Sequence, residues 1–384
     1  MNNKLIKKLA LGLALVVTVT SLPVTANAAK APGFKTQKAT VKVGMTKKYT
    51  TVNTGKKGDS KAKRYSVSFE IGNESLATIK YSKGSKSVKI TGVKAGETVL
   101  TANFKNYKTK KVTTATLPVT VKDTTVTKAA KDYFANYVDR KKQPADVFKL
   151  IEENANIVII DIRDAESYKA EHLKGAINIP YKNIAEYLDI IPNDVPVYVN
   201  CFSGQTASQT VALLAVAGKD AYNIQGGWNN GISADTNYKN YVETTVNPLP
   251  TKKYPVNAYV QEAITKYYED AAASASGNFN FQATDLAKLI EAGDDTYTVV
   301  DIRSAADYAA GHIEVVELNI PFATDAMPAD FDKIPMDKPV IIQCTSGQTA
   351  SQTIAILRLL GYEAYNLSGG MKNGWLKSEL PVVK

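Results

Sequence analysis

Short runs of apolar residues, most of them alternating with polar ones, fill the first part of the chain. The clearest runs are residues 65–70, 87–90, 98–102 and 117–121. A period of two places alternate side chains on one face, so these runs predict half-buried strands. The Gly, Asn, Ser and Lys clusters between them are typical of turns. We therefore predict an all-β domain over residues 30–125, built as a β-sandwich.

The rest of the chain alternates strand-like and helix-like patterns. Four apolar runs in its first half predict buried strands: residues 157–160, 176–179, 197–199 and 221–224. Between the last two, residues 206–217 carry Ala, Leu and Val at helical spacing and end at Gly218. This alternation predicts an α/β fold, in which helices cover both faces of a parallel sheet.

The α/β pattern occurs twice, because this part of the chain is an internal repeat. Residues 203–210 return letter for letter as residues 346–353. The repeat has the length of a whole domain and not of a solenoid unit. We therefore predict two independently folded α/β domains with parallel sheets, residues 128–247 and 256–384, joined by a proline-rich linker.

The N-terminus has the pattern of a processing segment. Three lysines fall within the first eight residues, an apolar run covers residues 9–17, and Ala26 and Ala28 are small residues suited to signal peptidase. A transmembrane anchor is the alternative, but the run falls short of the roughly 20 apolar residues that a span needs. We predict a signal peptide over residues 1–28. The mature protein would then be secreted, extracellular or cell-wall associated, with no membrane span.

Charge is distributed unevenly along the chain. The whole chain has 47 basic and 37 acidic residues, and by count 21 basic against 5 acidic residues fall within 30–125. A basic domain favours anionic partners. For an exported protein we expect an anionic cell-wall polymer and no nucleic acid, with an ordinary solvated surface as the alternative.

The chain has two cysteines, Cys201 and Cys344. Exported proteins usually pair their cysteines, but each of these lies in a separate copy of the repeat, so we expect free thiols. Each cysteine directly follows a predicted buried strand and precedes a helix. Backbone N–H groups and the helix dipole at such a turn should favour the nucleophilic thiolate. Gly204 and Gly347 would permit the tight turn.

Several motifs recur around the two cysteines in both copies. They are an Asp-x-Arg triplet, an Asn-Ile-Pro triplet, a six-residue Cys-x-x-Gly-x-Thr loop and a Gly-Gly pair before the final helix. In combination they resemble the rhodanese family over nearly all of both copies. The resemblance implies that Cys201 and Cys344 accept sulfane sulfur as a persulfide and pass it to a thiol or cyanide. The loop residues implied to hold the persulfide are Phe202, Ser203, Gly204, Gln205 and Thr206, and Thr345, Ser346, Gly347, Gln348 and Thr349.

The resemblance also bears on the substrate. Phosphatases related to this family need one more loop residue, so the six-residue loop favours sulfur. Neither loop carries a basic residue, and Ser167 and Asp307 stand where the family has a donor-binding arginine. Neutral loops are similar to those of mercaptopyruvate sulfurtransferases. Thiosulfate, mercaptopyruvate and polysulfide therefore remain open as donors, and no cofactor is expected.

The remaining repeated residues are expected to be structural. Asp161 with Arg163, and Asp301 with Arg303, should form buried ion pairs near the loops. In the family the two histidines, His172 and His312, lie away from the cysteine loop and make structural hydrogen bonds. Two histidines in different domains do not form the set of ligands that zinc needs, so we expect no metal site.

The all-β domain resembles bacterial immunoglobulin-like domains of surface proteins, on residues 74–79 and 90–98. Such domains are usually spacers or adhesion modules. Two functions thus stay open: a secreted sulfurtransferase, or a non-catalytic surface protein that uses rhodanese folds for interaction or persulfide binding.

Overall fold

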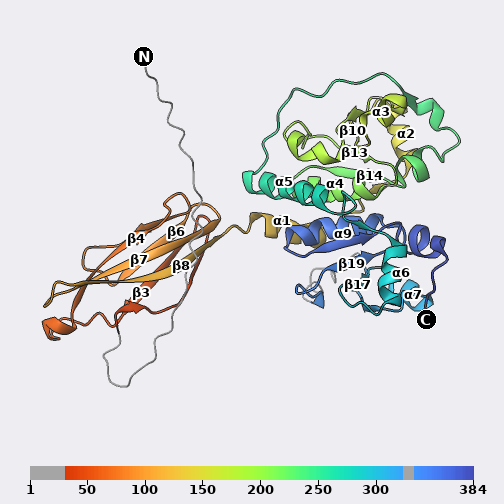
Figure 1. The fold of residues 1–384 in the computed structure, drawn as a ribbon. Coiled ribbons are helices and arrows are strands. Elements are labelled where there is room, and N and C mark those ends of the chain that lie inside the picture. Colours follow the sequence, from red (N-terminus) through yellow and green to blue (C-terminus); the bar gives the residue numbers. More distant parts are fainter. Residues whose placement is uncertain (1–30, 323–332) are drawn as a thin grey trace, which may run out of the picture. The chain divides into compact units, whose positions relative to one another are not determined.

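The computed structural model describes residues 31–322 and 333–384 (Figure 1). The predicted signal peptide, residues 1–28, lies outside them. The chain forms two compact units, which divide between Lys122 and Asp123. Within the described ranges, no helix has both the length and the apolar character required to cross a membrane.

The first unit consists of eight strands in two four-stranded sheets. One sheet has the order β1-β3-β6-β5 and the other the order β2-β8-β7-β4. Their bounds are Gly33–Phe34 (β1), Ala39–Lys42 (β2), Thr46–Val52 (β3), Tyr65–Ile71 (β4), Ala77–Lys80 (β5), Ser87–Gly92 (β6), Gly96–Asn106 (β7) and Val112–Lys122 (β8). All pairings are antiparallel except β2 with β8.

Both sheets of the first unit contribute to one core. Ile90 of one sheet and Leu100, Phe104 and Leu117 of the other are fully buried and belong to the same cluster. Alternate residues of β2, β3, β4, β6, β7 and β8 are buried, as the period of two requires. The four strands predicted in this region are confirmed, while the immunoglobulin-like assignment stays a prediction.

The second unit contains two five-stranded sheets, one for each repeat, and every pairing in them is parallel. The first has the order β12-β10-β13-β14-β9, with Lys141–Lys142 (β9), Val158–Asp161 (β10), Ile177–Asn178 (β12), Val197–Asn200 (β13) and Ala221–Ile224 (β14). The second has the order β16-β20-β19-β17-β18, with Asn280–Phe281 (β16), Thr298–Asp301 (β17), Val316–Asn319 (β18), Val340–Gln343 (β19) and Ala364–Leu367 (β20). A short antiparallel pair, His172–Leu173 (β11) and Val242–Glu243 (β15), lies beside the first sheet.

Helices follow the strands in both repeats, as predicted for α/β domains. The first repeat has Thr125–Ala135 (α1), Pro144–Glu152 (α2), Ala165–Ala170 (α3) and Gln205–Val216 (α4). The second has Ala258–Ala273 (α5), Ala283–Glu291 (α6), Ala305–Ala310 (α7) and Gln348–Leu359 (α9). A single-turn π-helix follows the Gly-Gly pair in the first repeat, at Trp228–Ile232, and begins at the second glycine of the pair in the second repeat, at Gly370–Trp375. The predicted strands and the predicted helix of the first repeat are therefore confirmed.

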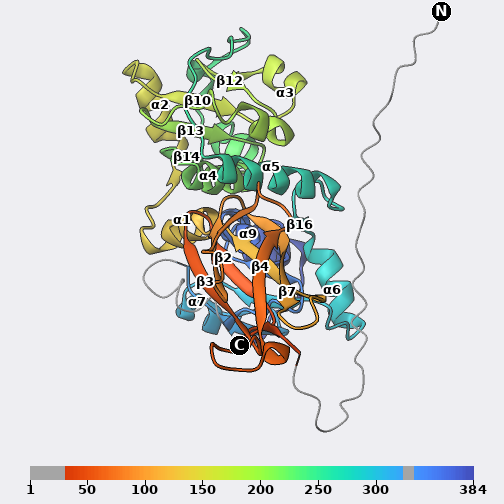
Figure 2. The same cartoon turned by 90° about the vertical axis from the view of Figure 1, so that its left-hand side faces the viewer.

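The two repeats pack against each other through α4 and α9, which lie side by side in both views (Figures 1 and 2). The first helix of each repeat reaches the other repeat. Phe134 of α1 lies 6.0 Å, ring to ring, from Phe322 of the second repeat, and Tyr268 of α5 lies 5.0 Å from Tyr181 of the first. One apolar cluster includes residues of both repeats. The repeats therefore share part of their core, and each also has a buried cluster of its own. Independent folding of the two domains stays a prediction.

One local difference separates the repeats. The first turns at Gly175, which has a φ of 74°. The second has no glycine there and one more residue, and β17 pairs with β18 through a shift in register between Val299 and Val300. The extra residue is absorbed as a bulge, so the geometry of the two copies differs at this turn.

Candidate active site

Each cysteine stands at the carboxyl end of a central strand of its sheet. Cys201 follows β13 and Cys344 follows β19, and each loop runs directly into the first turn of α4 or α9. Open α/β sheets place their sites at this edge, because loops after parallel strands meet there. Cys201 is 2% exposed and Cys344 is 4% exposed, and both are free thiols.

Backbone N–H groups point at the sulfur in both loops. The N–H groups of Gly204 and Ala207 donate to Cys201 Sγ at 3.1 and 3.4 Å. Those of Gly347 and Ala350 donate to Cys344 Sγ at 3.2 and 3.3 Å. The sulfur therefore lies inside the curl of the loop, facing the first turn of the helix, where N–H groups lack helical partners.

Burial opposes these N–H groups at the second cysteine. The N–H groups of Ser346, Gly347, Thr349 and Ala350 lower the pKa of the Cys344 thiol, but loss of hydration raises it by more, so the pKa lies above its ordinary value. Burial penalises the charged form of any acid. The prediction that the loop favours the thiolate is therefore wrong in net effect at Cys344, although the predicted N–H groups are present.

Glycines allow the loop and the Gly-Gly turn to approach each other closely. Gly204 and Gly347 have φ values of 80° and 79°, in the left-handed region. A Cβ on Gly227 would lie 2.5 Å from both the Cys201 carbonyl oxygen and the Gly204 nitrogen, and one on Gly370 would lie 2.3 Å from the Cys344 carbonyl oxygen. The second glycine of each pair is thus required because its backbone packs directly on the cysteine loop.

The Asp-x-Arg triplets form the ion pairs that we predicted, and all four side chains are at most 8% exposed. Arg163 binds Asp161 with Nε–H and Nη2–H at 2.6–3.0 Å and also donates to the Glu171 carbonyl. Arg303 and Asp301 repeat this arrangement at 2.7–3.2 Å. Because each carboxylate is engaged by its own arginine, neither arginine is a free cation for substrate.

A cavity of about 320 Å³ opens onto the second cysteine. Its lining includes Cys344, Thr345 and Thr349 of the loop and Arg303 and Asp307 of the same repeat. It also includes Tyr137, Asp139 and Lys141, which belong to the first repeat. The site at Cys344 is therefore completed by residues from both repeats.

Comparison with known proteins agrees with this geometry. A family model described as a rhodanese-like domain matches residues 143–234 and 282–377. A thiosulfate sulfurtransferase GlpE of Actinobacillus succinogenes is 31% identical over 91 residues, which cover 22% of this chain and 82% of that protein. The chain belongs to the rhodanese family. A second GlpE, from Pseudomonas fluorescens, is 36% identical over 72 residues, 18% of this chain and 66% of that protein.

Among solved structures, a rhodanese-related protein of Thermoplasma volcanium is similar to this chain. The sequence identity is 27%, the TM-score is 0.24, and the match covers 27% of this chain and 96% of that one.

Two residues of the predicted rhodanese loops have side chains that reach the other repeat. Gln205 Oε1 accepts from Asn366 Nδ2 at 2.8 Å and from Gly369 N at 2.9 Å, both in the second repeat. Gln348 Oε1 reciprocally accepts from Asn223 Nδ2 at 2.8 Å and Gly226 N at 3.1 Å in the first. Each glutamine also donates from Nε2 to a serine of its own loop, Ser203 at 3.1 Å or Ser346 at 3.4 Å. The glutamines therefore connect each rhodanese loop to the opposite repeat.

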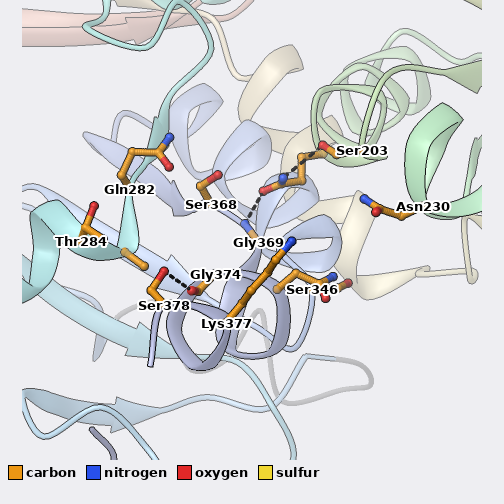
Figure 3. A pocket seen from close by; sticks show the side chains of 13 residues that line it. Ser203, Asn230, Gln282, Thr284, Ser346, Ser368, Gly369, Gly374, Lys377 and Ser378 are labelled. Atoms are coloured by element: carbon orange, nitrogen blue, oxygen red, sulfur yellow. Dashed lines mark hydrogen bonds between the residues drawn. The ribbon is translucent and has the colours of Figure 1, made fainter. Parts of the chain in front are cut away.

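The two loops therefore lie close to a common boundary. Ser203 and Ser346, one from each loop, line the same polar cavity of about 270 Å³ (Figure 3). The dashed line to Gly369 in Figure 3 marks its bond to Gln205. Phe202, in contrast, is exposed, and the Arg163 guanidinium lies 5.8 Å from its ring centre.

Both histidines make the structural contacts that we expected. His172 is fully buried, and its ring nitrogens lie 2.6 Å from the Tyr168 carbonyl oxygen and 3.0 Å from the Thr245 carbonyl oxygen. His312 Nδ1 lies 3.1 Å from the Tyr308 carbonyl oxygen. Each ring also stacks on the tyrosine four residues earlier.

The contribution of Tyr137, Asp139 and Lys141 was missed from the sequence. They lie about 200 residues before Cys344, and no motif links them to it. Their proximity comes from the packing of the repeats, and the one related sequence signal was the absence of a basic residue from the loop.

Proposed function

We propose that this protein is an exported sulfurtransferase that carries sulfane sulfur as a persulfide on Cys201 and on Cys344. Homology to the rhodanese family and its thiosulfate sulfurtransferases supports a sulfurtransferase-type function. The observation that carries the proposal is the geometry repeated at both cysteines, with two backbone N–H groups within 3.4 Å of each Sγ. Such donors stabilise an anionic sulfur held in the loop.

The reaction has two balanced steps. A cysteine thiolate attacks the sulfur that the donor gives up, which is the outer sulfur of thiosulfate, a sulfane sulfur of polysulfide or the thiol sulfur of mercaptopyruvate. A new S–S bond forms, and the donor's bond to that sulfur breaks. The leaving group (sulfite from thiosulfate, pyruvate enolate from mercaptopyruvate, or a shortened polysulfide) keeps the electron pair. A thiolate or cyanide then attacks the outer sulfur of the persulfide, and the cysteine leaves as a thiolate, ready for another donor.

Peptide-resolved mass spectrometry of the full chain tests this proposal. After exposure to thiosulfate, mercaptopyruvate or polysulfide, the peptides with Cys201 and Cys344 should each gain the mass of one sulfur atom, and cyanide should remove it. Absence of the gain with all three donors would contradict the proposal.

A non-catalytic, persulfide-binding role is the second candidate. It is favoured by the deep burial of both cysteines and by the raised pKa of Cys344, since both slow the attack of a thiol. The number of turnovers of the full-length protein separates the two roles. An enzyme turns over repeatedly when donor and cyanide are in excess, whereas a binding protein gives at most one equivalent per cysteine.

For the first unit we propose an immunoglobulin-like domain that binds an anionic cell-wall polymer outside the cell. Two sheets around one core support the assignment, and the excess of lysines supports the partner. Among described residues 31–122, no lysine is within ion-pair distance of a carboxylate, so these charges are available to a polyanion.

Sedimentation with purified cell walls tests this partner. Replacing four exposed lysines of the first unit by Gln should weaken pelleting of the full chain; they are Lys105, Lys108, Lys110 and Lys111. The same change at four exposed lysines of the second unit should not weaken it; they are Lys128, Lys149, Lys169 and Lys266. Salt should release the protein, because the Debye length falls from about 10 Å at 0.1 M to about 3 Å at 1 M. Equal pelleting of both variants, or retention at high salt, would contradict an electrostatic anchor.

A further inference from the structure

The two cysteine loops lack the cation that an anionic sulfur donor needs. The residue after each cysteine is Phe202 or Thr345, and the loop ends at Thr206 or Thr349. Arg303, the arginine that lines the Cys344 cavity, is bound to Asp301 through both Nε and Nη2. Asp307 also lines this cavity and adds negative charge. Two lysines lie beside this loop, Lys372 of the second repeat and Lys141 of the first, and of these two the described lining of the cavity that contains Cys344 includes Lys141.

Lys141 supplies a positive charge at this position. It belongs to β9 of the first repeat, lines the cavity that contains Cys344, and donates from Nζ to Thr349 Oγ1 at 3.4 Å. Its side chain is 25% exposed. The nearest carboxylate, Asp139 at 3.6 Å, is 66% exposed, so water screens this pair and leaves much of the lysine charge available.

The packing of the repeats holds Lys141 at the second loop. Lys141 pairs with Asn223 across the edge of the first sheet. Asn223 Nδ2 donates to Gln348 Oε1, and Gln348 directly precedes Thr349, the partner of Lys141. One buried hydrogen bond thus connects the sheet of the first repeat to the end of the second loop. This connection holds the backbone of Lys141 near Cys344.

We propose that Lys141 is the anion-binding residue of the Cys344 site, and that it gives this site a preference for anionic sulfur donors that the Cys201 site lacks. The proposal rests on the sulfurtransferase function proposed above. When the Cys344 thiolate takes the outer sulfur of thiosulfate, sulfite leaves with the electron pair. The ammonium group of Lys141 neutralises charge on the donor and on the leaving sulfite, and keeps its own proton.

The first site lacks the matching residue. In the second repeat, the strand position equivalent to Lys141 is Asn280, which pairs with Asn366 as Lys141 pairs with Asn223. Asn280 is neutral, and its Oδ1 accepts from Asn366 Nδ2. The pocket beside the first loop contains a lysine, Lys377, but neither Cys201 nor Thr206 is among its described lining residues (Figure 3).

The test compares both cysteines within one full-length molecule. The rate of loading is followed on each cysteine peptide by mass spectrometry with two donors. Dianionic thiosulfate adds one sulfur atom and releases sulfite, whereas attack on the central sulfur of neutral dimethyl trisulfide leaves a CH3S–S group on the cysteine and releases methanethiolate. Lys141→Gln removes the charge, Lys141→Arg retains it, and Lys142→Gln is the matched control, because Lys142 Nζ lies over the Tyr222 ring at 5.0 Å.

We expect Lys141→Gln to raise the apparent KM for thiosulfate at Cys344 roughly tenfold, with a smaller change in kcat, as for loss of a partly exposed charged contact. Loading of Cys201, and loading by the trisulfide, should stay unchanged. Lys141→Arg should keep the apparent KM for thiosulfate at Cys344 close to that of the parent protein, and Lys142→Gln should leave it unchanged.

Three outcomes would overturn the inference: unchanged thiosulfate loading in Lys141→Gln, an equal loss at both cysteines, or an equal loss with the neutral donor. In each of them the parent protein still loads sulfur, so the proposed function survives. If the parent loads neither cysteine with any donor, the proposed function fails and the inference fails with it.

Discussion

Replacing Gln348 by Ala should destabilise the whole second unit. The side chain is 5% exposed, and its Oε1 is the acceptor for Asn223 Nδ2 and for the Gly226 N–H. Alanine removes the acceptor and leaves both donors at the boundary between the repeats, where Gln348 had excluded water. The perturbation is local, because the backbone of the loop and the start of α9 need no change.

The magnitude follows from the two stranded donors. A buried donor that loses its acceptor costs about 1–3 kcal/mol, and one of the two donors here is a side chain that can partly reorient. Alanine has a slightly higher helix propensity, worth at most about 0.5 kcal/mol at this position. We therefore expect the free energy of unfolding of the second unit to fall by about 2–4 kcal/mol.

Tryptophan fluorescence during urea unfolding of the full chain provides the assay. The chain has two tryptophans, Trp228 and Trp375, one in each repeat, so the signal reports on the second unit. The control is Gln225→Ala, which removes an exposed bond to Gln143 and should cost less than about 1 kcal/mol. If Gln348→Ala and the control unfold at the same urea concentration, the reasoning about buried donors at the boundary is refuted.

Three further predictions concern the loops. Gly227→Ala should abolish sulfur loading at Cys201, because the added Cβ would lie 2.5 Å from the loop backbone. The control is Gly175→Ala, where φ is also positive but no atom lies within 4 Å of the added Cβ. Equal losses of loading in both variants would refute the role of the contact. Because burial raises the pKa of the Cys344 thiol, this thiol stays protonated to higher pH. Its rate of sulfur loading should therefore keep rising beyond about pH 8.5, the ordinary thiol pKa. A pH profile of loading on the Cys344 peptide tests this, and a plateau below that pH would contradict it. Thr345→Arg should lower the apparent KM for thiosulfate at Cys344, and steady-state kinetics showing an unchanged KM would mean that the cations and amides already present saturate donor binding.

Local patterns predicted the local structure well. Period-two runs gave strands at β4 and β6, and the run of Ala, Leu and Val gave α4, because burial of one face fixes both kinds of element. The cysteine loops were also found from local signals, since the strand, the cysteine and the glycine are adjacent in the sequence. The N–H groups at Sγ follow from that order of elements.

Contacts between the repeats could not be predicted in this way. We predicted Gln205 and Gln348 as residues of the persulfide loops, because the motif gives their positions but does not show where their side chains point. Their partners lie 161 and 125 residues away. The pKa of the Cys344 thiol could not be predicted either. The sequence indicated the N–H groups that lower it, but the burial that raises it depends on how the two repeats pack.

The central claim is that both cysteines carry the transferred sulfur, and a set of three variants tests it most directly. Sulfur transfer from each donor to cyanide is measured for Cys201→Ser, Cys344→Ser and the double variant of the full chain. We predict that each single variant loses part of the activity and that the double variant loses all of it. A double variant that keeps the parent rate would contradict the persulfide mechanism at these two cysteines.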